Sequence, residues 1–524
     1  MLAGQKHILH IHSRIPVSGL VTVEWCQVRN SLSINTYHGL QASEPTQVKK
    51  SRYHTCARTV QCEDMSVNPF PSLAKRFIHN RKPRGKSNKV VRFIIAPIES
   101  IPTKAKLYSF KEHFNIPRRA TRDDWIHDGT FHDAIAGLLL AAQFCGVMPV
   151  CGITAKDPKM LYFSWKSKRT FYTYAACLGT AFFSVNAIIR FFMRNFSFVA
   201  MTVVFFYTYN LYGLYCFLRV AQKWPALIRR WHQVEQLLPQ SSNLLERAVL
   251  AKKIKLISTF LITMSLMEHL ISIISAVYYS PNCPEIPDPL DKFMKTNFIF
   301  IFHFFKYSKL RGFFVKLINV ISTFVWSYVD LFVIVVSIGL SHCYKRINEF
   351  LMEHKRKKMT ERFWGEQRVN YRNICDLVQS VDDVISVITM LSISNNLFYI
   401  CISILNSLNS QPTIAHMLYF WFGLAFLIGR TLAVTMYAAE VNDESMRPIE
   451  VLRTIPREGW CLEAKRFTEE VINDTVALTG MKFFNMTRQL VLKVTGTIIT
   501  YELVLIQFHQ NDQEEVDLCT MQWV

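Results

Sequence analysis

The chain has 524 residues, of which 50% are hydrophobic, and it carries a formal net charge of +21. Only 19% of its residues are charged, against about 25% in soluble proteins, and long uncharged runs separate them. This composition excludes an ordinary soluble enzyme. The thirteen cysteines form no CxxC pair, so they indicate neither a zinc site nor a disulfide scaffold, and we expect no metal and no cofactor.

Basic side chains outnumber acidic ones in residues 1–130, where no hydrophobic period is sustained. Scattered Pro, Ser, Lys and Arg are typical of disorder, so we predict a basic, largely disordered cytoplasmic region. The apolar segment 131–153 contains polar side chains and is predicted as a juxtamembrane helix.

Residues 154–508 are predicted to form a seven-helix transmembrane domain, because about 20 mostly apolar residues cross a bilayer. Basic loops follow the second and fourth spans, and positive charge marks the cytoplasmic side. If 131–153 crossed as an eighth span, both loops would fall outside. Seven spans place the N-terminus in the cytoplasm and 509–524 in an extracellular tail. The predicted spans are about 170–192, 195–220, 254–279, 315–342, 384–408, 413–438 and 486–508.

Three segments between the spans have helical composition: 346–359, 366–383 and 460–482. The fourth and fifth spans are therefore expected to continue into the cytosol. Such extensions form either a contact region between subunits or amphipathic surface helices, and the sequence leaves both interpretations open.

The last predicted span carries a mostly polar stripe. Lys493, Thr497, Thr500, Val504 and Gln507 fall on one helical face. Unpaired polar groups in hydrocarbon cost several kcal/mol, so this face should avoid lipid. It faces either neighbouring helices or a water-filled pore enclosed by several copies of the chain.

The C-terminal segment TYELVLIQF, at 500–508, resembles the TYhhhhhQF signature of insect gustatory receptors, in which h is hydrophobic. Glu502 after Tyr501 is similar to the sugar-receptor branch of that family. FNMTR at 484–488, GTII at 496–499, KWP at 223–225 and PVCGI at 149–153 resemble the same branch. The resemblance covers about residues 125–510.

The resemblance implies a fold similar to insect odorant receptors, with seven spans and four subunits around a central cation pore. It places Gln507 and Phe508 at the pore constriction, with Val504, Thr500 and Thr497 below them. An apolar ring can close a pore by dewetting. Glu502 either attracts cations or packs between subunits, and Cys283 and Cys519 are both extracellular in this topology.

A sugar site needs hydrogen-bonding side chains together with aromatic rings that stack on C–H faces. Ionisable groups at membrane depth are functional candidates. The alternative interpretation is that they pair with each other, or with a Ser hydroxyl, to hold helices together. Arg430 should pair with an acid or extend to the cytosolic side. The sugar-binding candidates are Glu268, His269, Trp326, Asp330, Asn395, Asn396, Tyr419 and Trp421.

These observations predict a sugar-gated, non-selective cation channel, in the plasma membrane of gustatory neurons and their dendrites. Its partners are then a sugar, permeating cations, the lipid bilayer and other gustatory receptor subunits in a homo- or heterotetramer, but no nucleic acid. The alternatives are a seven-helix receptor that signals through a G protein and a multispan sugar transporter. No HExxH, P-loop or GxSxG pattern with supporting context indicates an enzyme.

Overall fold

The computed structural model describes residues 130–193, 198–239, 244–279, 288–407 and 414–490, together with 492, 493, 496 and 500. The chain divides into two units, Met1–Ile98 and Glu99–Val524, and all described residues belong to the second. Except for Thr130, the predicted disordered region 1–130 lies outside the described residues, and so does the predicted tail 509–524.

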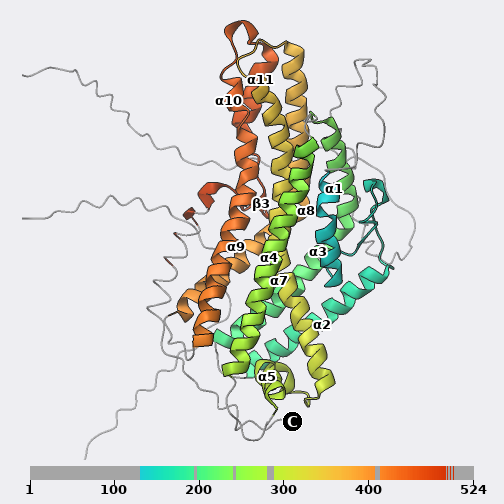
Figure 1. Ribbon diagram of the computed structural model, residues 1–524, viewed down its shortest axis with the longest axis vertical. Helices are drawn as coiled ribbons and strands as arrows, with labels where there is room; N and C mark the ends of the chain where they lie inside the picture. The colour runs from blue at the N-terminus through green and yellow to red at the C-terminus, as the bar shows by residue number, and fades with distance from the viewer. Residues whose placement is uncertain are drawn as a thin grey trace, which may run out of the picture. The chain divides into compact units, whose positions relative to one another are not determined.

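The described residues are mostly helical (Figure 1), which confirms the predicted all-α class apart from two short strand pairs. The helices are α1 (Phe131–Phe144), α2 (Lys168–Met193), α3 (Phe198–Leu237), α4 (Leu244–Tyr279), α5 (Pro289–Asn297), α6 (Ile299–Phe302), α7 (Lys309–Glu353), α8 (Glu361–Asn406), α9 (Ile414–Met446), α10 (Ile449–Leu452) and α11 (Leu462–Asn473). The strands are β1 (Val150–Cys151), β2 (Tyr162–Phe163), β3 (Thr479–Gly480) and β4 (Phe484–Asn485), paired antiparallel as β1–β2 and β3–β4.

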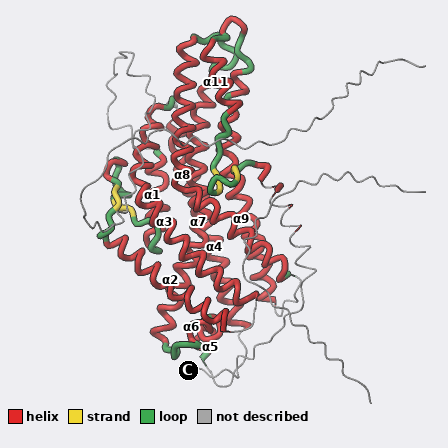
Figure 2. The backbone as a smooth tube through the Cα atoms, turned by 180° about the vertical axis from the view of Figure 1, so that it is seen from behind, coloured by secondary structure: helices red, strands yellow, loops and turns green. Residues whose placement is uncertain are grey.

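Six described helices, α2, α3, α4, α7, α8 and α9, are long and apolar enough to cross a membrane. They coincide in order with the first six predicted spans. The seventh predicted span, 486–508, lies mostly outside the described residues. Figure 2 shows α11 at one end of this helical bundle and α5 and α6 at the other.

Helix α7 forms the centre of the bundle and packs against α3, α4, α8 and α9. Every residue from 328 to 341 is buried, which explains the near-continuous apolar sequence of this segment. Its first turn is capped by the Ser308 hydroxyl, which accepts a hydrogen bond from the Arg311 N–H. The helix then runs without interruption to Glu353, beyond the predicted end of the fourth span.

Helix α1 packs one face against the bundle and leaves the other face exposed. Its Phe131 ring stacks on Trp231 of α3 with the centroids 4.0 Å apart, and the Phe131 N–H donates to the buried Glu235 carboxylate at 3.1 Å. The segment predicted as one helix, 131–153, is helical only to Phe144, and β1 begins at Val150. Gly152 has a φ of +81°, and a Cβ there would lie 2.2 Å from the Met160 carbonyl oxygen, so the turn after β1 requires glycine.

The predicted helix 460–482 is shorter than expected. Helix α11 ends at Asn473, and β3 and β4 follow it as a hairpin. The expected cytosolic extensions of the fourth and fifth spans are both helical, because α7 continues to Glu353 and α8 begins at Glu361. Helix α11 packs against α8 and α9 at this end of the bundle.

Candidate ligand pocket

A cavity of about 690 Å³ opens between α3, α4, α7, α8 and α9, with α5 and α6 beside it. This places it at the end of the bundle opposite α11 (Figure 2). Its polar and aromatic lining residues are Thr202, Phe206, Tyr207, Glu268, His269, Ser272, Phe293, Asn297, Phe298, Phe300, Lys316, Asn319, Thr323, Trp326, Tyr399, Ser403, Asn406, His416, Tyr419 and Phe420.

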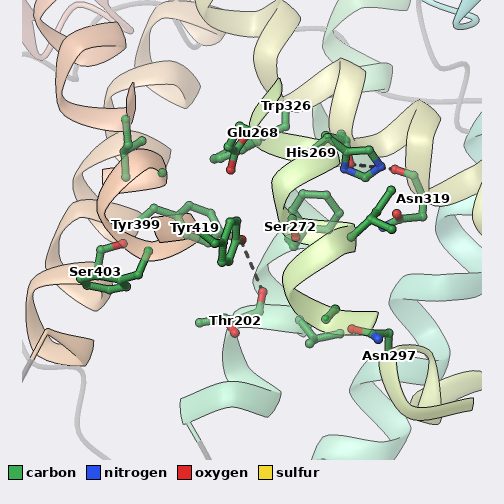
Figure 3. A pocket seen from close by; sticks show the side chains of 18 of the residues that line it. Thr202, Glu268, His269, Ser272, Asn297, Asn319, Trp326, Tyr399, Ser403 and Tyr419 are labelled. Carbon is green, nitrogen blue, oxygen red and sulfur yellow. Dashed lines mark hydrogen bonds between the residues drawn. The ribbon is translucent and has the colours of Figure 1, made fainter. Parts of the chain in front are cut away.

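One wall of this pocket comes from α4. Glu268, His269 and Ser272 line it within little more than one helical turn (Figure 3). Among the described residues, neither Glu268 Oε2 nor His269 Nε2 has a hydrogen-bond partner. A buried polar atom without a partner costs about 1–3 kcal/mol, so a polar ligand that bonds these atoms would remove that cost.

A group of aromatic side chains in the lining comes from α7, α8 and α9. The Trp326 and Tyr399 rings meet edge to face with centroids 5.5 Å apart, and the Tyr399 hydroxyl donates to the Thr202 carbonyl at 3.5 Å (Figure 3). Tyr419 completes this group. The Trp326 indole nitrogen has no partner among the described residues and is available as a donor.

A third polar group, which the sequence analysis missed, lies toward α5. Lys316 donates to the Asn319 side-chain oxygen at 3.2 Å, and the Asn319 amide donates to the Tyr207 hydroxyl at 3.2 Å. The Lys316 ammonium lies 5.7 Å from the centroid of the Phe293 ring. The sequence does contain a signal for this group. Successive steps of 3, 4 and 3 residues place its members on one face of α7: Lys316, Asn319, Thr323 and Trp326.

A buried ion pair lies beneath Trp326. Arg430 Nε of α9 is 2.7 Å from Asp330 Oδ2 of α7, and both side chains are almost wholly excluded from solvent. The Ser392 hydroxyl and the Asn396 amide of α8 also donate to Asp330. The Arg430 guanidinium lies 4.3 Å from the centroid of the Trp326 ring, so the ion pair supports the indole that lines the pocket.

The predicted sugar-binding residues therefore fall into three groups. Glu268, His269, Trp326 and Tyr419 line the pocket. Asp330, Asn395 and Asn396 are buried and do not line it. Asn396 donates to Asp330 across α8 and α7, which is the helix-joining contact that the sequence left open, whereas Asn395 donates to its neighbour Asn396 at 3.4 Å. Trp421 is 56% exposed on the outside of α9, because two residues along a helix lead to the opposite side from Tyr419.

Of the predicted pore residues, Thr500 belongs to the described part of the chain. Thr500 is exposed, and its hydroxyl donates to the Gly496 carbonyl at 2.9 Å. Thr497, Tyr501, Glu502, Val504, Gln507 and Phe508 lie outside the described residues, as do Cys283 and Cys519.

Comparison with known sequences decides the family. The profile of the family described as "Trehalose receptor" matches residues 103–519. The chain belongs to this insect sugar gustatory receptor family. The resemblance carried by the C-terminal motif is thereby confirmed, and the relatives of this receptor are chemoreceptors and not enzymes.

Two relatives from Drosophila melanogaster align over most of their length. The receptor is 44% identical over 398 residues to "Gustatory receptor for sugar taste 64f", which covers 75% of this chain and 84% of that protein. It is 40% identical over 393 residues to "Gustatory receptor 5a for trehalose", which covers 75% of this chain and 88% of that protein.

The fold of the receptor is that of the insect olfactory receptors. The structure of the olfactory receptor OR5 from Machilis hrabei in complex with eugenol superposes with a TM-score of 0.57 at 14% identity, over 74% of this chain and 100% of that chain. The structure of OR5 itself superposes with a TM-score of 0.53 at 13% identity, over 72% of this chain and 98% of that chain.

Proposed function

We propose that this chain is a subunit of a sugar-gated, non-selective cation channel in the plasma membrane of gustatory neurons. The sugar binds in the pocket between α3, α4, α7, α8 and α9. The N-terminus is cytoplasmic, and four subunits, identical or mixed with related receptors, surround one pore. Family membership and the olfactory-receptor fold support this proposal.

The observation that carries the proposal is the chemistry of the pocket lining. Sugar hydroxyls need both donors and acceptors, and a sugar ring presents C–H faces to aromatic side chains. Glu268 and His269 supply polar atoms that lack partners among the described residues, and Trp326 supplies the ring. The cavity volume of about 690 Å³ lies within the range of about 300–1,000 Å³ usual for small-molecule sites.

The gate is proposed in the last helix. The stripe of Thr497, Thr500, Val504, Gln507 and Phe508 lines the pore, with Gln507 and Phe508 at its constriction. A sugar opens the gate only to the extent that it binds the open conformation more tightly than the closed one. The pocket side chains therefore contact the sugar more closely when the pore is open.

Replacing Trp326 with alanine tests the pocket. Loss of the stacking ring should raise the sugar concentration for half-maximal current about tenfold, which corresponds to about 1.4 kcal/mol of binding free energy. Trp421→Ala is the matched control, because Trp421 lies on the other side of α9. The measurement is whole-cell current against a sugar panel that includes trehalose, with and without co-expressed relatives.

Two results would contradict the proposal. Equal sugar responses in Trp326→Ala and Trp421→Ala, at equal surface abundance, would exclude this pocket as the sugar site. A tag at residue 1 that is accessible on intact cells would exclude a cytoplasmic N-terminus and favour a G-protein-coupled receptor.

A further inference from the structure

The hairpin formed by β3 and β4 has an uncommon backbone that is held by its surroundings. Met481 and Lys482 in its turn have φ values of 50° and 65°. Residues other than glycine rarely adopt this backbone conformation. Gly480 precedes them, and a Cβ there would lie 2.4 Å from the Phe484 ring. Such conformations persist where neighbouring contacts fix them.

Those contacts come from α8, and the carboxylate of Asp382 makes most of them. The buried Asp382 accepts hydrogen bonds from the Thr479 N–H at 2.6 Å, from the Thr479 hydroxyl at 2.8 Å and from Lys482 Nζ at 2.5 Å. Lys482 also lies 3.1 Å from Asp383. One turn further along α8, the Ser386 carbonyl accepts from the Met481 N–H at 3.2 Å. The hairpin is thus fastened to α8 over little more than one helical turn, from Asp382 to Ser386.

The chain leads from this hairpin directly into the last predicted span. Only three residues after β4, Arg488 Nε lies 2.5 Å from Asp443 Oδ2 of α9. The start of the segment that leads to the proposed pore helix is therefore held by carboxylates of two membrane helices. Neither contact involves a residue of the pocket.

Helix α8 also reaches the pocket. Tyr399 and Ser403 line the cavity, and Ser392 donates to Asp330 below it. Tyr399 is 17 residues from Asp382 on a helix that is continuous from Glu361 to Asn406, which is roughly 25 Å at 1.5 Å per residue. One continuous helix therefore connects the pocket to the hairpin.

We propose that Asp382 is the positioning residue that couples the ligand pocket to the last helix, through its bonds to Thr479 and Lys482. This inference rests on the proposed function, in which the last helix holds the gate. Coupling of this kind is a free energy between two sites. Weakening it lowers the response to bound sugar without removing the binding site.

The main test variant is Lys482→Met, because Lys482 is 48% exposed and its replacement leaves the core intact. Thr479→Val and Asp382→Asn remove the other bonds to the same carboxylate. The matched control is Glu470→Gln, which removes contacts of α11 with Arg368 and Arg372 of α8 but does not touch the hairpin. Lys482→Arg keeps the charge and should restore the response.

Three quantities are compared in full-length protein. They are the trehalose-evoked current at equal surface abundance, the shift of the thermal unfolding midpoint by trehalose, and the amide exchange of residues 486–500 without sugar. We expect Lys482→Met to lower the maximal current about fivefold or more, the lower range of typical couplings. The trehalose-induced thermal shift should stay within error of wild type, and amide exchange of residues 486–500 should accelerate. Glu470→Gln should change none of these three.

A maximal current in Lys482→Met and Thr479→Val equal to that of Glu470→Gln would overturn the inference. So would a fall in current matched by loss of the trehalose-induced thermal shift, because the variant would then have lost the pocket. If the wild type shows neither sugar-evoked current nor a thermal shift, the proposed function fails. Amide exchange of residues 486–500 then tests the attachment of the hairpin to α8 separately. Faster exchange in Lys482→Met supports this attachment, and exchange equal to that of Glu470→Gln overturns it.

Discussion

Among single residues, Asp330 and Arg430 form the ion pair near the pocket whose disruption should destabilise the fold most. Both side chains are buried, and they belong to different helices. Removing one partner of a buried ion pair leaves an uncompensated charge and costs about 3–5 kcal/mol, whereas replacing both can be nearly neutral.

We therefore expect Asp330→Asn to lower the thermal unfolding midpoint and the surface abundance strongly. The double variant Asp330→Asn/Arg430→Gln should recover a large part of both, since no charge is then left alone. Thermal unfolding of the purified receptor, monitored by size-exclusion chromatography, measures the difference in stability between the single and the double variant. A double variant less stable than Asp330→Asn would show that the charges do not depend on each other.

Individual pocket residues could be predicted only in part from the sequence. Glu268 and His269 were found because charged or titratable groups are rare in apolar helices. Asp330 satisfied the same rule but faces Arg430, since membrane depth does not reveal the direction in which a side chain points. Lys316 was missed because it lies near a helix end, where a lysine usually indicates the membrane boundary.

Among whole elements, the long helices follow from composition and the hairpin does not. Uncharged runs of about 20 residues are a strong local signal. They located both ends of α2, the end of α4 and the start of α9 within two residues, but α4 begins ten residues earlier than predicted and α9 ends eight residues later. The segment 460–482 is predicted to be one helix, but the observed helix α11 ends at Asn473. The bonds that Asp382 makes to Thr479 come from a residue almost one hundred positions earlier, and no local pattern records such a contact.

Helix α11 should be sensitive to acid. Arg368 of α8 lies 2.9 Å from Glu463 and 2.8 Å from Glu470. Burial alone would raise the pKa of Glu463, but its hydrogen bonds to Arg466 and Arg368 outweigh burial and hold the pKa below its ordinary value of 4.5. A carboxyl group with a lowered pKa stabilises the folded state above its unfolded pKa, and this stabilisation is lost as the pH falls through the folded pKa.

The wild-type receptor should consequently lose thermal stability more steeply than Glu463→Gln as the pH falls from about 6 to about 3.5. Thermal unfolding of both proteins across that range provides the measurement. Parallel pH profiles would show that Glu463 contributes no pH-dependent stability.

For the molecule as a whole, the proposed gate is the feature to test. Gln507→Ala and Phe508→Ala should alter the leak current or the maximal sugar-evoked current, because both residues are proposed at the constriction. The thermal shift that the proposed sugar ligand causes should remain, since neither residue belongs to the pocket. Current recordings together with thermal shifts separate the two effects. Wild-type currents in both variants would place the gate elsewhere.

The family and the fold were accessible from the sequence because a nine-residue motif is specific and hydropathy is a strong signal. The relative rotation of the helices was not. It determines that Tyr419 faces the cavity while Trp421 is exposed on the outside of α9, and it depends on packing between segments far apart in the chain.

The burial of α7 after Trp326 bears on how the sugar site and the ion path relate to each other. Residues 328–341 are enclosed by neighbouring helices, and the Asp330–Arg430 pair lies at the top of this stretch. Along α7, the lining residue Trp326 is thus followed by a stretch that is closed off from solvent. Under the proposed function, in which the sugar occupies the pocket and the last helix lines the pore, the side chains that select a tastant differ from those that a permeating ion meets. Taste preference and conductance can then change independently during evolution.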